Sequence, residues 1–241
     1  MMLSKNEIKY IQSLCHKKHR QAEGLFIAEG PKVVTELLKS DYKVRDVYAV
    51  KEWISANPGV QAKEISPEIL EKISALQAPN QVLAVAEQRV HADEPVPETG
   101  IILALDGIRD PGNMGTIIRI ADWFGISQIV ADEDTVELYN PKVIQATMGS
   151  FMRVKLWYKP LASFLSDSKL PVYGALLNGT AIHEQAPLAN GILVIGNESK
   201  GIREDVLPLV QHALTIPRIG GAESLNAAVA TGILLSHLTR R

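Results

Sequence analysis

The chain has 241 residues but only one cysteine, Cys15, which excludes an internal disulfide and a multi-cysteine zinc site, so no metal centre is expected. It contains no run of eighteen apolar residues, and no membrane span is predicted. The first residues lack the apolar core of a secretory signal, so we expect a cytoplasmic protein. Neither a G-x-G-x-x-G nor a Walker pattern occurs, which removes the usual support for a dinucleotide site or a P-loop.

The chain also lacks an excess of either charge, since 25 basic residues face 27 acidic ones for a net charge of −2. This balance gives no global support for nucleic-acid binding. The first twenty residues are different, because they carry five basic side chains against the single acid Glu7: Lys5, Lys9, Lys17, Lys18 and Arg20. Two interpretations stay open here, a solvated helix face and a patch that contacts phosphates.

The chain is long enough for one large domain or two modest ones. Residues 91–100 hold two prolines, three acids and a glycine, and this composition is typical of a linker. We therefore predict two domains, residues 1–95 and residues 99–241. In the first domain the patterns predict helices over residues 4–14, 31–40 and 66–76 and strands over residues 44–50 and 81–87. This domain shows no catalytic constellation.

The second domain alternates short apolar runs with helical patterns. Strands are predicted over residues 101–105, 128–131, 172–177, 192–195 and 213–216. Helices are predicted over residues 113–124, 141–148, 161–168, 203–210 and 224–238. Such alternation indicates an α/β domain with a mostly parallel sheet, and ligands bind such sheets at the carboxyl ends of the strands.

Three clusters of polar residues and glycines fall at those strand ends. The first runs from Asn113 to Arg119, the second covers residues 196–201, and the third begins at Ile216 and continues into a helix expected to start at Ser224. Each cluster alone is typical of an ordinary turn or helix cap. A glycine at a strand end also allows the backbone to approach a ligand closely, and a helix N-terminus offers free N–H groups.

Taken in order, the clusters read Asn-x-Gly-x-x-x-Arg, Gly-x-Glu-x-x-Gly, and Ile-Pro followed by Ser-Leu-Asn-x-x-x-Ala. This order and spacing resembles the three motifs of the SpoU/TrmH RNA ribose 2′-O-methyltransferases of the SPOUT superfamily. The resemblance covers residues from about 100 to 241. Residues 1–95 are similar in length and element order to the small α/β, ribosomal-protein-like RNA-binding domain that often precedes this catalytic domain. One departure is the last helix, where many relatives carry a late Glu and this chain reads Ile-Leu-Leu-Ser-His-Leu.

The resemblance implies a C-terminal trefoil knot that binds S-adenosyl-L-methionine and a homodimer whose active sites draw on both chains. It implies cofactor contacts from the backbone of Gly196, Ile216 and Leu225. It assigns activation of the ribose hydroxyl to Arg119, acting on cofactor held by the partner chain. The residues expected to position the reactants are Asn113, Glu198, Ser224 and Asn226.

The role of Arg119 has two interpretations. Since a guanidinium has a pKa above about 12, a neutral arginine base is costly, and Arg119 could instead bind a phosphate and orient the hydroxyl. The substrate is expected to be structured RNA, with ribosomal RNA favoured over transfer RNA. The alternatives are a tRNA 2′-O-methyltransferase and a non-catalytic RNA-binding protein of the same fold; the missing glycine fingerprints argue against an unrelated nucleotide enzyme.

Overall fold

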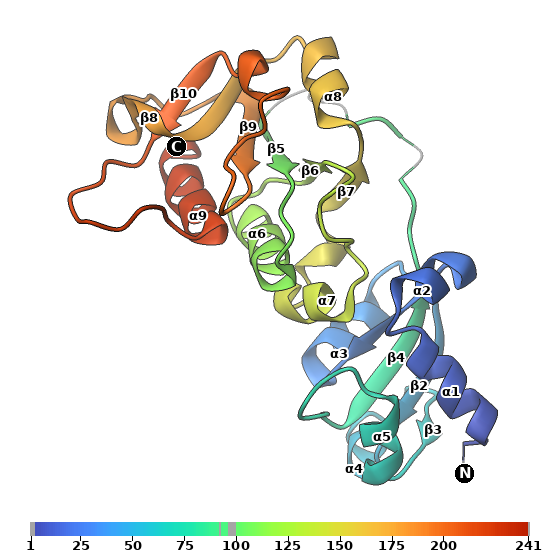
Figure 1. The fold of residues 1–241 in the computed structure, drawn as a ribbon. Helices are drawn as coiled ribbons and strands as arrows, with labels where there is room; N and C mark the ends of the chain where they lie inside the picture. The colour runs from blue at the N-terminus through green and yellow to red at the C-terminus, as the bar shows by residue number, and fades with distance from the viewer. Residues whose placement is uncertain (1–2, 92, 96–99, 241) are drawn as a thin grey trace. The chain divides into compact units, whose positions relative to one another are not determined.

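The computed structural model describes residues 3–91, 93–95 and 100–240, and its contacts divide the chain into two compact units (Figure 1). Unit 1 comprises Met1–Val90 and Glu137–Met152, and unit 2 comprises His91–Val136 and Arg153–Arg241. The linker predicted at residues 91–100 and the predicted domain start at residue 99 lie partly outside the described residues. Over the described ranges, every helix is too short or too polar to cross a membrane.

Unit 1 is built on a four-stranded sheet with the strand order β1-β4-β2-β3. The strands are β1 (Leu25–Glu29), β2 (Val44–Ala49), β3 (Lys63–Glu64) and β4 (Val82–Glu87). Strand β4 runs antiparallel to both of its neighbours, and β3 runs parallel to β2. The helices are α1 (Lys5–Ser13), α2 (Lys17–Glu23), α3 (Pro31–Lys39), α4 (Lys51–Ala56) and α5 (Pro67–Ile73).

The predicted elements of unit 1 are confirmed to within a few residues at their ends. The Ser4 hydroxyl accepts the Glu7 N–H at 3.2 Å, and the Glu7 carboxylate accepts the Ser4 N–H at 3.0 Å, which is the capping box that the sequence predicts. Helices α2 and α4 and strands β1 and β3 were not predicted. The reason for α2 is that its sequence, Lys-Lys-His-Arg-Gln-Ala-Glu, has no apolar stripe.

A segment from far along the chain completes the core of unit 1. Helix α7 (Pro141–Thr147) and the short 3₁₀-helix η1 (Ser150–Met152) belong to this unit by their contacts. The ring of Tyr139 lies 4.7 Å from that of Phe26, and the ring of Phe151 lies 5.5 Å from that of Tyr42. The sequence predicts residues 137–152 within the second domain, whereas this aromatic packing, which local pattern does not reveal, places them in unit 1.

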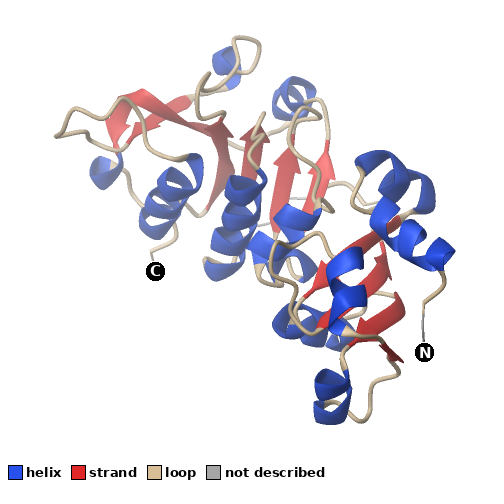
Figure 2. Cartoon of the chain, turned by 60° about the horizontal axis from the view of Figure 1, so that its bottom comes forward, coloured by secondary structure: helices blue, strands red, loops and turns tan. Residues whose placement is uncertain are grey.

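Unit 2 contains a six-stranded sheet in which every neighbouring pair is parallel, with the strand order β10-β8-β9-β5-β6-β7. Helices flank the strands of this sheet (Figure 2). The strands are β5 (Gly100–Asp106), β6 (Gln128–Ala131), β7 (Lys155–Tyr158), β8 (Val172–Ala181), β9 (Asn190–Gly196) and β10 (His212–Thr215). The helices are α6 (Pro111–Trp123), α8 (Leu161–Asp167) and α9 (Ala227–Leu238), with the 3₁₀-helices η2 (Ile182–Glu184) and η3 (Leu207–Leu209). The predicted α/β fold with a mostly parallel sheet is therefore confirmed.

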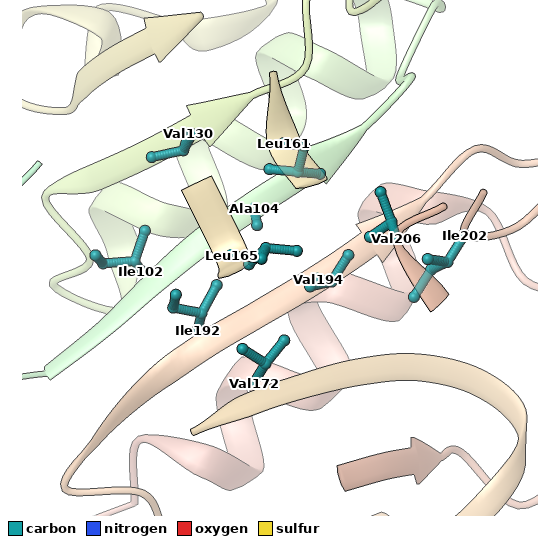
Figure 3. Close-up of a cluster of buried hydrophobic side chains, with 10 residues drawn as sticks. All are labelled: Ile102, Ala104, Val130, Leu161, Leu165, Val172, Ile192, Val194, Ile202 and Val206. Atoms are coloured by element: carbon teal, nitrogen blue, oxygen red, sulfur yellow. The ribbon is translucent and has the colours of Figure 1, made fainter. Parts of the chain in front are cut away.

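Side chains on both faces of this sheet are buried, as the apolar strand sequences predict. On one face, buried side chains from the sheet pack against α8 and the segment after β9 (Figure 3): Ile102, Ala104, Val130, Leu161, Leu165, Val172, Ile192, Val194, Ile202 and Val206. Helices α6 and α9 pack side by side, and α9 also contacts β9. Buried apolar side chains of β5 and β9 thus fix the position of the edge at which these two strands end.

Two local predictions for unit 2 are wrong, and one strand was not predicted. Residues 203–210 form a turn and the 3₁₀-helix η3 instead of an α-helix, because Pro208 cannot donate within a helix interior. Strand β7 was missed. Helix α9 begins at Ala227 and not at Ser224, because the Asn226 side chain caps it by accepting the N–H groups of Ala228 and Val229 at 3.0 and 3.2 Å.

Candidate active site at the carboxyl edge of the parallel sheet

The three sequence clusters meet where β5 and β9 end. These strands are parallel neighbours, and their last residues, Asp106 and Gly196, lie opposite each other in the register. Helix α6 starts after the turn that follows β5, with Pro111 in its first turn and the Asp110 carboxylate accepting the Asn113 N–H at 2.7 Å. The cap therefore places Asn113 beside the end of β9.

A chain of hydrogen bonds joins one residue from each cluster. Asn226 donates from Nδ2 to Asn113 Oδ1 at 2.8 Å, and Asn113 donates from Nδ2 to Glu198 Oε1 at 2.5 Å. The direction is fixed, because Asn226 Oδ1 is already used to cap α9 and only its Nδ2 is left to donate. Glu198 therefore acts as the acceptor at the end of the chain. The structure thus brings together Asn113, Glu198 and Asn226 as one polar group.

Glu198 sits on a tight turn, which we call the Glu198 loop (residues 196–202). Asn197 and Gly201 exchange two backbone hydrogen bonds of 3.0 and 2.9 Å, and Asn197 Nδ2 donates to Gly107 O at 2.8 Å. A Cβ at Gly196 would lie 2.4 Å from the Gly201 carbonyl carbon and 2.5 Å from Ile202 N. The space beside Gly196 is thus filled by the chain's own backbone. Packing of the Glu198 loop therefore requires a glycine here, in addition to the close approach of a ligand that the sequence predicts.

Arg119 lies apart from this group. It is exposed on α6 and makes no hydrogen bond or ion pair with the described residues. Six residues of α-helix place it about 9 Å along the axis from Asn113 and about 120° around it. Its side chain therefore shares a face with Thr116 and Trp123 rather than with the cap of α6.

The remaining predicted site residues lie on the segment between β10 and α9. Ile216 is half-buried, Ser224 is exposed and outside the helix, and the side chain of Leu225 is 46% exposed. Residues 216–225 make no backbone–backbone hydrogen bond with the described residues. Except for Ala222 O, which accepts a hydrogen bond from Arg218 Nη1 at 3.1 Å, their N–H and C=O groups are available to a ligand, as contacts through the backbone of Ile216 and Leu225 require.

Sequence reasoning missed a second polar group at the same edge. Asp106 is fully buried at the end of β5, Asp132 follows β6, and Arg203 follows the Glu198 loop. The Arg203 guanidinium lies 2.6 Å from Asp106 Oδ1 and 2.5 Å from Asp132 Oδ2. A carboxylate directly after a buried apolar run was the available signal, at both Asp106 and Asp132.

Burial raises the pKa of Asp106 more than Arg203 lowers it. At Asp132 burial also raises the pKa, but the hydrogen bonds from Arg203, Asp134 N and Leu161 N outweigh it, and the pKa is lowered. Burial lowers the pKa of Arg203, yet the two carboxylates together raise it above the ordinary arginine value. The guanidinium therefore stays charged between two carboxylates in different environments.

The basic residues predicted to bind RNA divide into two groups. Lys5, Lys9, Lys17 and Lys18 are exposed on α1 and α2 and make no ion pair with the described residues. Arg20 is 1% exposed, donates to Leu14 O at 2.8 Å and forms an ion pair with Glu137. Its assignment to the RNA-contacting patch is wrong, because a side chain buried against a carboxylate within unit 1 cannot reach a phosphate.

An all-parallel sheet covered by helices, with its polar groups at the carboxyl edge, defines an α/β ligand-binding domain. Residues 100–236 match the model of the SpoU rRNA Methylase family, and residues 5–84 match that of the MRM3-like substrate binding domain. The chain belongs to the SpoU rRNA methylase family.

Similar proteins and structures agree with this assignment. The chain is 30% identical to the 23S rRNA (guanosine(2553)-2′-O)-methyltransferase RlmP of Bacillus subtilis over 98% of this chain and 97% of that protein. A putative RNA methyltransferase of the TrmH family from Porphyromonas gingivalis is 38% identical, with a TM-score of 0.86 over 99% of this chain and 98% of that one. The AdoMet-bound rRNA methyltransferase of Sinorhizobium meliloti is 29% identical, with a TM-score of 0.84 over 99% of this chain and 95% of that one.

Proposed function

We propose that this chain transfers a methyl group from S-adenosyl-L-methionine to a ribose 2′-hydroxyl in ribosomal RNA. The observation that carries the proposal is the hydrogen-bonded chain Asn226–Asn113–Glu198, which joins the three family motifs at one edge of the sheet. Membership of the SpoU family and the rRNA named for the Bacillus subtilis and Sinorhizobium meliloti relatives support the substrate class.

The residues at this edge fit the cofactor. Apart from Ala222 O, the backbone groups of residues 216–225 have no hydrogen-bond partner among the described residues and suit the hydrogen-bonding edge of an adenine. Exposed apolar side chains such as Leu225 and Ile219 suit its ring. In the proposal the backbone of Gly196, Ile216 and Leu225 holds the cofactor. When bound, a sulfonium would supply the methyl group, and its leaving group, a neutral thioether, needs no acid assistance. The protein has therefore only to orient the ribose hydroxyl in line and to accept or share one proton.

The positioning task is assigned to Asn113, Glu198 and Asn226. Their geometry is fixed by the cap of α9 on one side and by the Glu198 loop on the other. Ser224, exposed two residues before Asn226, is included as a further contact to the reactants. Groups held in place before the reactants arrive lower the entropic cost of reaching the reactive geometry.

Arg119 is proposed to act on the RNA in an active site whose cofactor is held by a second copy of the chain. It is exposed, has no partner among the described residues, and points to a different side of α6 from Asn113. Large apolar side chains are also exposed on the two paired helices: Trp123 is 84% exposed on α6, and Val229 and Ile233 are 51% and 38% exposed on α9. Such a patch is typical of an interface, which supports a homodimer through this face. In both interpretations, as proton acceptor or as a phosphate contact beside the hydroxyl, Arg119 acts at the ribose.

Unit 1 is proposed to bind the RNA, with Lys5, Lys9, Lys17 and Lys18 contacting phosphates. The match of residues 5–84 to a substrate binding domain supports this role. The trefoil knot belongs to the same proposal, supported by the likeness to TrmH-family structures. A cytoplasmic location stays a prediction, in keeping with a ribosomal RNA substrate.

The test is a methyl-transfer assay with the purified chain, S-adenosyl-L-methionine, and either ribosomal or transfer RNA from cells that lack the protein. We expect one ribose in ribosomal RNA to gain a 2′-O-methyl group with the unaltered chain and not with the Glu198→Gln chain. If only transfer RNA is methylated, the substrate is transfer RNA and the proposed ribosomal RNA substrate is wrong. Cofactor binding or RNA binding without transfer would point to a non-catalytic protein and overturn the proposal.

A further inference from the structure

The Glu198 loop is tied to the turn after β5 at one point and to the last residue of β5 at another. At its start, Asn197 Nδ2 donates to Gly107 O at 2.8 Å, while Asn197 Oδ1 accepts the N–H groups of Ser199 and Lys200. At its end, the Arg203 N–H donates to Asp106 Oδ2 at 2.7 Å. Since Asn113 follows the same turn, these two ties set the distance between Glu198 and the residue to which it bonds.

The Arg203 side chain reinforces the second tie. It passes between the ends of two strands, where its Nε lies 2.6 Å from Asp106 Oδ1 and its Nη2 lies 2.5 Å from Asp132 Oδ2. Asp132 is itself held by the N–H groups of Asp134 and Leu161, both at 3.2 Å. The exposed Asp205 lies 3.8 Å from Arg203 Nε. One planar guanidinium thus connects the strand ends of β5 and β6 to the end of the Glu198 loop.

Apolar packing fixes the neighbouring residues. Ile202 is 7% exposed and Val206 is fully buried, and both pack against the face of the sheet that carries Val194 (Figure 3). Arg203 has Ile202 beside it in the chain and Val206 one turn further on, so its backbone has little freedom to move. The side chain, being 34% exposed, is the part of this connection that a substitution can change without opening the core.

We infer that Arg203, held by Asp106 and Asp132, is a positioning residue that sets the Glu198 loop for the methyl transfer. The inference rests on the proposed roles of Glu198 and Gly196. Without the guanidinium, two buried carboxylates lose their counter-charge and the loop is held at its end by one backbone hydrogen bond. Glu198 would then sample positions away from Asn113, and Gly196 would move with it.

The experiment compares Arg203→Met and Arg203→Lys with Arg153→Met, which removes an exposed ion pair with Asp122 elsewhere in unit 2. Each full-length variant is measured well below its melting temperature. The readouts are hydrogen exchange at the Asn197 and Gly201 amides, the affinity for S-adenosyl-L-methionine, and kcat and KM for the RNA.

We expect Arg203→Met to speed exchange at both amides, to weaken cofactor binding and to lower kcat on the order of 100-fold, with little change in KM for the RNA. In Arg203→Lys we expect smaller changes in exchange, cofactor affinity and kcat, because an ammonium can keep one ion pair but cannot contact both carboxylates as the planar guanidinium does. Arg153→Met leaves all of them unchanged.

A lower melting temperature with unchanged exchange, cofactor affinity and kcat would make Arg203 merely structural and overturn the inference. A rise in KM for the RNA alone would make it an RNA contact and overturn the inference as well. Glu198→Gln is measured in parallel: if it keeps full turnover, the proposed role of Glu198 is wrong, and the exchange rates still decide whether Arg203 holds the loop.

Discussion

At the scale of single residues, the candidate site is ordered by which side-chain atoms are already in use. The side-chain oxygen of Asn226 caps α9, so its amide nitrogen donates to Asn113, which in turn donates to Glu198. An aspartate at position 113 or 226 would keep the size but put an acceptor where a donor is needed. The direction of the hydrogen bonds in the site therefore depends on the side-chain amides of Asn113 and Asn226 and not on charge alone.

Arg119 gives the first prediction at this scale. Arg119→Ala should lower turnover by about 100-fold or more while the affinity for S-adenosyl-L-methionine stays unchanged, because the side chain acts on the RNA. Arg119→Lys should recover little, since an ammonium cannot replace a planar fork. Single-turnover methyl transfer and calorimetry measure the two effects. Near-normal turnover of Arg119→Ala would remove this residue from the mechanism.

Gly196 gives the second. Gly196→Ala places a Cβ within 2.7 Å of three backbone atoms of Gly201 and Ile202, so the Glu198 loop has to open. We expect a loss of about 1–3 kcal/mol in the free energy of unfolding, as for other overpacked sites, together with weaker cofactor binding. Gly59→Ala is the matched control, because nothing lies within 4 Å of a Cβ there and the residue lies in unit 1. Equal unfolding midpoints of the two variants in urea would contradict the prediction.

Glu29 gives a prediction about pH. Burial raises the pKa of this carboxyl above its ordinary value of 4.5, although hydrogen bonds from Ser74 and Ala75 lower it in part. The folded state therefore holds the proton more tightly than the unfolded chain. The stability from the protonated form is fully present below the ordinary pKa and is lost as pH rises through the raised folded value.

Glu29→Gln keeps an acceptor for the Ala75 N–H without the buried charge, and its amide nitrogen can donate to the Ser74 hydroxyl, which itself donates to Glu29 in the unaltered chain. We expect its melting temperature to exceed that of the unaltered chain at pH 7 and to approach it near pH 4. Melting curves across this range measure the difference. A gap that widens as the pH falls would show that the sign is wrong.

At the scale of elements, α6 and α9 lie side by side and start at the same end. Asn113 meets Asn226 near their first turns, and Ile120 Cδ1 lies 3.6 Å from the position of a Cβ at Gly232. Their outer sides expose Trp123 and Val229, which leaves apolar surface for the proposed second copy of the chain.

Trp123→Asp should weaken the proposed homodimer by about 30-fold or more, because a buried tryptophan anchor is commonly worth about 2 kcal/mol or more. Tyr10→Asp, on α1 of unit 1, exposes a similar aromatic ring and serves as the control. Light scattering over a dilution series measures the dissociation constant. A chain that is strictly monomeric at micromolar concentration would contradict the dimer itself.

At the scale of the whole molecule, the chain enters unit 1 twice. Residues 137–152 leave the sheet of unit 2 and add Tyr139 and Phe151 to the core formed around Phe26 and Tyr42. The Tyr139 hydroxyl also accepts the Arg89 N–H at 2.7 Å, and Glu137 pairs with the buried Arg20. Unit 1 is therefore completed by residues that follow the first strands of unit 2.

Lys17 and Lys18 give the prediction at this scale. Replacing both with Gln should lower RNA affinity and reduce the slope of log K against log salt by roughly two units, if each lysine contacts one phosphate. Cofactor binding should not change. Lys169→Gln, an exposed lysine just before β8, is the control. Coincident affinities and slopes for the double variant and the unaltered chain would leave α2 a solvated helix face.

The sequence alone determined the elements whose information is local. Apolar runs identified five of the six strands of unit 2, the capping box identified α1, and the order of three short motifs led to the SpoU family. These features are readable because caps, turns and periodicity act over a few residues. The motifs also supplied Asn113, Glu198 and Asn226, which the structure brings within hydrogen-bonding distance.

Only the tertiary structure decided what depends on residues distant in the chain. In the sequence Arg20 resembles the neighbouring lysines. In the structure it pairs with Glu137, which lies more than a hundred residues further along the chain. Arg203 and Asp132 meet Asp106 only because β5, β6 and β9 are neighbours in the sheet. Burial of a charge and its pairing are properties of packing, and the chain between the partners carries no local signal of them.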